Sequence, residues 1–138
     1  MFSKIMAPVD LAHLDKLEKA LRCTADLARH YKARVIYVAV TSALPGKIAH
    51  TPEEFGRKLD AFAAEQGEAH GIATSSHPML SHDPTTDLDQ ALLMAVTETG
   101  ADLVVMQSHI PNVADYIWPS NGGDIAAHAK ISVFVVRD

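Results

Sequence analysis

Apolar residues along the chain form short continuous runs, separated by longer segments of mixed character. Short runs rich in β-branched residues predict strands that are buried on both faces of a sheet. Four segments have this pattern: residues 4–9, 34–41, 103–107 and 132–137. A fifth segment, residues 72–80, is more polar and contains Pro78, which fits a strand at the edge of the sheet. The pattern therefore predicts five strands.

Between these strands the apolar residues recur at intervals of three and four positions, the spacing of an amphipathic helix. We expect helices over residues 14–31, 52–68, 88–99 and 124–130. Thr51 followed by Pro52 is a strong helix start, Thr86 or Asp87 can cap the third helix, and Gly100 marks its end. The regular alternation of strand and helix predicts an α/β fold, a doubly wound five-stranded parallel sheet with helices on both faces.

The composition, with 48% hydrophobic and 21% charged residues, is ordinary for a soluble globular protein. A chain of 138 residues fits one domain, residues 1–138. It has no apolar stretch near the roughly 20 residues of a membrane span and no signal-peptide pattern, so we expect a cytoplasmic protein without membrane insertion. The single cysteine, Cys23, cannot form an internal disulfide, which fits a reducing compartment. The net charge of −5, without a run of Lys or Arg, argues against nucleic-acid binding.

Polar residues follow the predicted strands at their carboxyl ends, where ligands bind in open α/β sheets. These residues are Asp10 after the first strand, Gln107, Ser108 and His109 around the end of the fourth, and Ser120 and Asn121 before the last helix. Asp10 has two interpretations from the residues alone. It can cap the following helix, or it can contact a ligand.

Two stretches of the chain carry a resemblance to a known family. The run V-V-M-Q-S-H, the later P-S-N and the closing A-A-H-A-K-I-S-V-F-V-V-R resemble the C-terminal half of the universal stress protein family, and the opening K-I-M-A-P-V-D resembles its first strand. The likeness spans nearly the whole chain and implies the strand order 3-2-1-4-5. In the family, the Asp that matches Asp10 contacts the adenine or ribose side of a nucleotide.

The resemblance also implies a set of candidate nucleotide-binding residues and a homodimer. The candidate pocket residues are Ala7, Pro8, Val9, Asp10, Val40, Met106, Gln107, Ser108, His109, Ser120 and Asn121. The implied dimer interface is the last strand, through Val133, Phe134, Val135 and Val136. An apolar edge strand of this kind is an aggregation liability when it is left open.

The phosphate-binding pattern of the family, G-x2-G-x9-G-S/T, is degenerate here. Gln107, Ile110 and Pro119 stand at or near its three glycine positions, and no glycine occurs from Ser108 to Ser120. Glycines let backbone N–H groups turn toward a phosphate, and proline has no N–H at all. We therefore expect a stress-response regulatory or binding module that does not bind ATP tightly and needs no cofactor. The alternative is an ATP- or AMP-binding stress sensor that uses the same pocket.

Catalysis and metal binding have weaker support in the sequence. The eight histidines are dispersed without H-x3-H or C-x2-C spacing, so we expect no metal site; the best convergence would be Asp10 with His109. Ser108 and His109 are neighbours but point apart on an extended segment, and no G-x-S-x-G elbow is present, so a weak metal-dependent hydrolase is only a second alternative with no catalytic residue assigned.

Two further features have a structural and a functional interpretation. Cys23 lies on the apolar flank of its helix, which favours packing over a nucleophilic role. The apolar loop residues Tyr116, Ile117 and Trp118 can close over the end of the sheet, cover the nucleotide space or anchor a protein partner.

Overall fold

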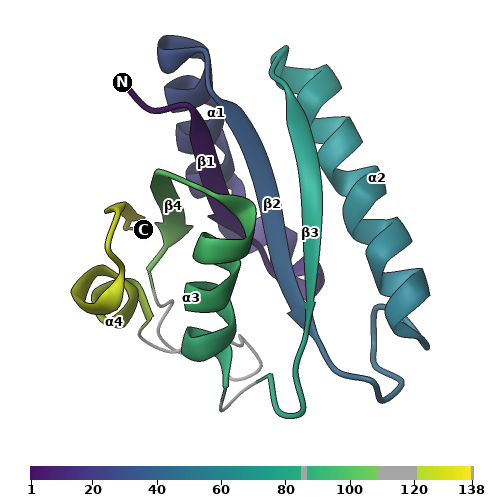
Figure 1. The fold of residues 1–138 in the computed structure, drawn as a ribbon. Helices are drawn as coiled ribbons and strands as arrows, with labels where there is room; N and C mark the ends of the chain where they lie inside the picture. The colour runs from purple at the N-terminus through teal and green to yellow at the C-terminus, as the bar shows by residue number, and fades with distance from the viewer. Residues whose placement is uncertain (85–86, 109–120, 138) are drawn as a thin grey trace.

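Five parallel strands form one sheet in the order β3-β2-β1-β4-β5 (Figure 1). The computed structural model describes residues 1–84, 87–108 and 121–137, with side chains undescribed for residues 121–124. The strands are β1 Lys4–Pro8, β2 Arg34–Thr41, β3 Thr74–Leu80, β4 Leu103–Gln107 and β5 Ser132–Val136. The predicted doubly wound sheet and its strand order are confirmed, and each strand lies within two residues of the predicted bounds.

Burial along the strands follows their position in the sheet. All five residues of β4 are buried, and β2 is buried from Val35 to Val40. Strand β3, which contains Pro78, is mostly half-buried and lies at one edge, where a missing N–H costs least. Strand β5 lies at the other edge. The polar character of the third strand thus reflects its edge position, as the sequence predicted.

In the described part of the chain, four α-helices and one 3-10 helix cover the two faces of the sheet (Figure 1). They are η1 Leu11–Leu17, α1 Glu18–Tyr31, α2 Pro52–His70, α3 Leu88–Thr99 and α4 Asn121–His128. Helix α1 packs on β1, β2, β4 and β5, whereas α3 packs on β1, β2 and β3 from the opposite face. This arrangement follows from right-handed crossovers between parallel strands.

The first predicted helix, residues 14–31, is wrong at its start. The segment Leu11–Leu17 is a 3-10 helix, and the backbone of His13 within it is non-helical, with φ −135°. The cause is Asp10, whose side chain accepts a hydrogen bond from the Ala12 amide and so starts a tight turn directly after β1. The α-helix proper begins only at Glu18.

The last predicted helix, residues 124–130, is shifted in the structure. Helix α4 begins at Asn121 and ends at His128. Glycine has a low helix propensity, yet Gly122 and Gly123 lie within the first turn of this helix. At the other end the Ala129 amide donates to the Ile125 carbonyl oxygen at 2.8 Å, which closes the helix before β5.

Helix α2 begins at the predicted residue and ends two residues later than predicted. The hydroxyl oxygen of Thr51 accepts from the Glu54 amide at 3.1 Å, and Pro52 is the first helical residue. The helix passes through Gly67 to His70 and ends at Gly71, which has φ 64°. At Gly67 a Cβ atom would lie 2.6 Å from the Thr74 hydroxyl oxygen, so this glycine permits close packing on β3 rather than ending the helix.

Helix α3 agrees with its predicted bounds, and one of its two predicted caps, Asp87, stands at the N-cap position. Asp87 precedes the helix without a side-chain hydrogen bond to it, and residue 86 lies outside the described residues. Gly100 ends the helix with φ 69°, as predicted. Within the described ranges, none of the helices is both long enough and apolar enough to cross a membrane.

Candidate functional site

The candidate site lies where β1 and β4 separate at the carboxyl edge of the sheet. The two strands pair only at Ile5–Leu103 and Met6–Val104, whereas β1 and β2 stay paired as far as Pro8. The Val9 amide donates to the Val38 carbonyl oxygen of β2 at 2.8 Å. Alternate residues of a strand face opposite neighbours, so the nitrogen of Pro8 faces β4, beyond the last pair of that ladder. The proline therefore costs no ladder bond and leaves the gap open.

Asp10 is buried at this gap, with 6% of its surface exposed, and its carboxylate contacts its own turn. Oδ1 accepts from the Ala12 amide at 3.0 Å, and Oδ2 lies 2.8 Å from Nδ1 of His13. A carboxylate only accepts hydrogen bonds, so Nδ1 of His13 carries the proton. The structure thus shows the capping interpretation of Asp10 directly, with one neighbour on each oxygen.

At the end of β4 the side chains are buried, and the first backbone N–H after the strand is already hydrogen-bonded. Met106 and Gln107 are 0% and 1% exposed. The Ser108 amide donates to the Val136 carbonyl oxygen at 2.8 Å and therefore continues the ladder between β4 and β5. That N–H is not available to a phosphate. Gln107 places a full side chain where the family pattern has a glycine.

The other candidate pocket residues fall into two groups. Ala7, Pro8, Val9 and Val40 are buried at the carboxyl ends of β1 and β2, close to Asp10 along the chain or sheet. His109 and Ser120 lie outside the described residues, as does the loop tip of Tyr116, Ile117 and Trp118, and Asn121 is described only as the first residue of α4. The predicted approach of His109 to Asp10 stays a prediction.

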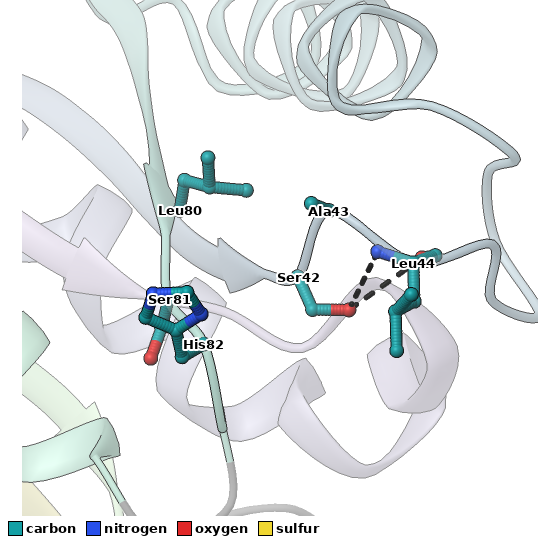
Figure 2. A pocket seen from close by; sticks show the side chains of 6 residues that line it. All are labelled: Ser42, Ala43, Leu44, Leu80, Ser81 and His82. Atoms are coloured by element: carbon teal, nitrogen blue, oxygen red, sulfur yellow. Dashed lines mark hydrogen bonds between the residues drawn. The ribbon is translucent and has the colours of Figure 1, made fainter.

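A pocket of about 370 Å³ opens at the same edge, beyond the ends of β2 and β3 (Figure 2). Ser42, Ala43 and Leu44 line one side, and Leu80, Ser81 and His82 line the other. The Ser42 hydroxyl contacts the Leu44 amide at 3.3 Å and its carbonyl oxygen at 3.5 Å, which shapes the loop after β2. Leu44 and Leu80 are 74% and 59% exposed, an unusual exposure for leucine.

None of these pocket residues was a candidate site residue from the sequence. Only their position could have identified them, because the loops after the second and third strands lie at the carboxyl edge of an open sheet, where ligands bind. Nothing in their residue types marks a particular chemistry. The pocket supplies apolar surface with two hydroxyl groups and one imidazole, which suits a small ligand with an apolar face.

Metal and nucleophile chemistry find little support. Among the residues that the structure describes, no group of three or more His, Cys, Asp or Glu side chains could hold a metal ion. Cys23 is half-buried against the core, and burial, followed by the charge of Asp26, raises the pKa of its thiol. A raised thiol pKa lowers the thiolate population, in line with the packing role predicted for Cys23.

Strand β5 presents the predicted apolar edge. It pairs with β4 at five residue pairs from Leu103–Ser132 to Gln107–Val136. Phe134 is 45% exposed and Val136 is 5% exposed, whereas Val133 and Val135 are half-buried. Phe134 and Val136 lie on the same face of the sheet by alternation, and of the two Phe134 is the exposed one.

Comparisons with known proteins agree with this fold. The profile of the Universal stress protein family matches residues 1–137. Universal stress protein G of Shigella flexneri is 26% identical over 148 residues, covering 99% of this chain and 100% of that protein. A universal stress protein solved in complex with cAMP superposes with a TM-score of 0.69 at 19% identity, covering 98% of this chain and 97% of the other.

Two further solved structures share the fold and contain adenine nucleotides. The Archaeoglobus fulgidus universal stress protein in complex with dAMP has a TM-score of 0.63 at 21% identity, covering 96% of each chain. An Arabidopsis thaliana family protein with AMP bound has a TM-score of 0.63 at 16% identity, covering 98% of this chain and 90% of that one. The profile match over residues 1–137, on the strand order described above, shows that this chain belongs to the universal stress protein family.

Proposed function

We propose that this chain is a stress-response binding module whose carboxyl-edge site does not bind ATP tightly. The observation that carries the proposal is the state of Asp10. Both of its carboxylate oxygens already contact the following turn, at the Ala12 amide and at His13. A ribose hydroxyl would have to share or displace these contacts, and replacing a charge-assisted hydrogen bond gains little net free energy.

The phosphate side of the site supports the same proposal. The Ser108 amide is used within the sheet, and the sequence from Ser108 to Ser120 contains two prolines and no glycine. A triphosphate needs several inward-facing backbone N–H groups, which glycine-rich loops supply. The stretch from Ser108 to Ser120 lacks the residue type that makes such a loop.

Calorimetric titration of the purified chain with ATP, AMP and cAMP, each with Mg²⁺, tests the proposal. We expect no ATP binding tighter than millimolar. His13→Ala removes the neighbour of Oδ2, so we expect this variant to gain about tenfold in nucleotide affinity, the effect of one charge-assisted hydrogen bond. His30→Ala, at an exposed position near the C-terminal end of α1, is the matched control and should leave the nucleotide affinity unchanged. Micromolar ATP binding by the unaltered chain would contradict the proposal.

A second candidate function is an AMP- or cAMP-responsive sensor. It is favoured by the solved relatives, which hold cAMP, dAMP and AMP on the same fold. Monophosphates need fewer backbone donors than ATP, so the missing glycines weigh less against them. Micromolar affinity for AMP or cAMP that falls at least tenfold in Asp10→Ala would select the sensor over the first function.

We also propose a homodimer that forms through β5. The strand has an unpaired side within the described residues, and Phe134 adds exposed apolar surface to it. A second copy of the chain, paired along β5, would cover the unpaired side of this strand and the exposed Phe134 side chain. Sedimentation at micromolar concentration should show a dimer that Phe134→Glu converts to monomer, whereas Leu44→Glu, exposed at the opposite side of the sheet, should leave it intact. A wild-type monomer would refute the dimer proposal.

For the compartment we propose the cytoplasm, on the sequence argument from the single cysteine.

A further inference from the structure

A second pocket, of about 510 Å³, lies at the amino edge of the sheet, opposite Asp10. Its walls are Ser3 before β1, the turn from α1 into β2, and the turn from α2 into β3; these turns lie at the upper end of the molecule in Figure 1. Three cationic side chains line it: Arg29, Lys32 and Arg34. We call this space the amino-edge pocket.

The charge in this pocket stands out against the rest of the chain. The protein has 12 Lys and Arg residues against 17 acidic ones, and three of the 12 line this pocket. The Arg29 guanidinium is fixed, because it donates to the His70 carbonyl oxygen at 3.0 Å and pairs with Asp26. Lys32 and Arg34 are exposed and form no ion pair with other described residues. The pocket therefore carries positive charge that the described residues do not neutralise.

Lys32 also has an unusual backbone. It follows α1 with φ 56° and ψ 41°, the left-handed conformation, whereas the corresponding positions after α2 and α3 are Gly71 and Gly100. A side chain at such a position is strained relative to glycine. Cations near a helix C-terminus are favourable, which accounts for Arg29 and partly for Lys32. It does not account for Arg34, which begins β2.

Three backbone amides of the pocket are already hydrogen-bonded. The Ala33 amide donates to Ala28 at 2.9 Å, the Arg34 amide to Ser3 at 3.0 Å, and the Ile72 amide to Gly67 at 3.2 Å. A bound anion would therefore be held by side chains. Phosphate is the anion that suits these side chains, because a guanidinium group donates to two phosphate oxygens at once and an ammonium group adds a compact positive charge.

Two acidic side chains lie beside the pocket. Asp26 is paired with Arg29, and Asp102 accepts from the Ser3 amide, the Ser3 hydroxyl and the Lys4 amide. Each carboxylate is thus occupied by its own partners. We propose that the amino-edge pocket binds the phosphate group of a small anionic ligand, at a site separate from the carboxyl-edge site.

A titration of the full chain, followed by amide NMR shifts at low salt, tests this proposal. The probes are inorganic phosphate, pyrophosphate and AMP. We expect shifts at residues 29–34 and 71–73 that weaken as salt screens the charges. Arg34→Gln and Lys32→Gly should each lower phosphate affinity about tenfold, the loss of one charge-assisted contact. Arg57→Gln, an exposed cation on α2, is the matched control and should bind as the unaltered chain does.

The outcomes separate the sources of the phosphate and the two proposed sites. Phosphate or pyrophosphate binding without AMP binding supports a free anion, and AMP shifts at residues 29–34 support a nucleotide phosphate. AMP shifts confined to the residues around Asp10, with none from phosphate or pyrophosphate, overturn the amino-edge proposal and leave the carboxyl-edge site intact. Equal losses in Arg34→Gln and Arg57→Gln, or shifts with polyglutamate but not with phosphate, also overturn it.

Discussion

Two glycines of helix α2 lie in different surroundings, and the same substitution at each should change stability in opposite directions. At Gly56 a Cβ atom would lie 3.8 Å from Cγ of Pro78, an ordinary contact. At Gly67 it would lie 2.6 Å from the Thr74 hydroxyl oxygen and 3.1 Å from the Ile72 carbonyl oxygen. Alanine gains helix propensity over glycine at both positions, by about 1 kcal/mol.

At Gly67 the steric term should outweigh that gain. The Thr74 hydroxyl donates to the Ala63 carbonyl oxygen at 2.6 Å, so it cannot move aside without weakening this bond. The bond contributes about 1 kcal/mol, and overpacking a tight contact costs about 1–3 kcal/mol. Subtracting the propensity gain, we expect Gly67→Ala to destabilise the fold by about 1–3 kcal/mol. Gly56→Ala should instead stabilise it by about 0.5–1 kcal/mol.

Urea unfolding followed by circular dichroism measures both changes. For a chain of this length, 1 kcal/mol corresponds to about 3–5 °C in Tm, so a thermal scan should give the same signs. Thr74→Ala removes the nearest contact, and the double variant Gly67→Ala with Thr74→Ala should lose less than the two single changes added together. If Gly67→Ala stabilises the protein as Gly56→Ala does, the close approach of α2 to β3 is wrong.

Three other changes test separate parts of the structure. Thr51→Ala removes the cap of α2 and should cost about 1 kcal/mol in urea unfolding, while Thr51→Asp should cost little. Lys32→Gly relieves a left-handed lysine and should add about 1 kcal/mol; a loss would mean that the charge matters more than the backbone. Burial raises the pKa of Asp102, but hydrogen bonds from Ser3 and Lys4 outweigh it and lower the pKa overall. The ionised Asp102 carboxylate therefore stabilises the fold above about pH 4, and this stabilisation is lost as the pH falls through its lowered pKa. Asp102→Asn should accordingly weaken the dependence of the unfolding free energy on pH at the acid side.

The strands could be predicted because their signals are local and strong. Residues 34–41 and 103–107 are nearly continuous apolar runs, and the strand order came with the family resemblance. Helix ends were predicted where one residue decides them, as Thr51 and Gly100 do, whereas the end of α2 at Gly71 lies beyond the predicted residue 68. Helix periodicity alone did not show that a 3-10 turn precedes α1, since Asp10 creates that turn through a single hydrogen bond.

The candidate site was harder to predict, since its properties depend on three-dimensional contacts. Asp10 could be identified from its place after β1, but not its contact with His13, three residues along a kinked backbone. The pocket of Ser42–Leu44 and Leu80–His82 joins two loops that are far apart in the sequence. The cations of the amino-edge pocket are close in sequence, yet only the fold shows that they surround a cavity.

The position of β1 sets the order in which the sheet can be completed during synthesis. This strand emerges first and pairs with β2, but its other neighbour, β4, begins only at Leu103. A nascent chain of three strands therefore exposes one side of its most central strand to the surroundings until Leu103 and the rest of β4 have been made. Exposed strand edges favour wrong pairing and aggregation. Protection of this strand by chaperones or by the ribosome surface should therefore matter more for its folding yield than the final stability of the sheet.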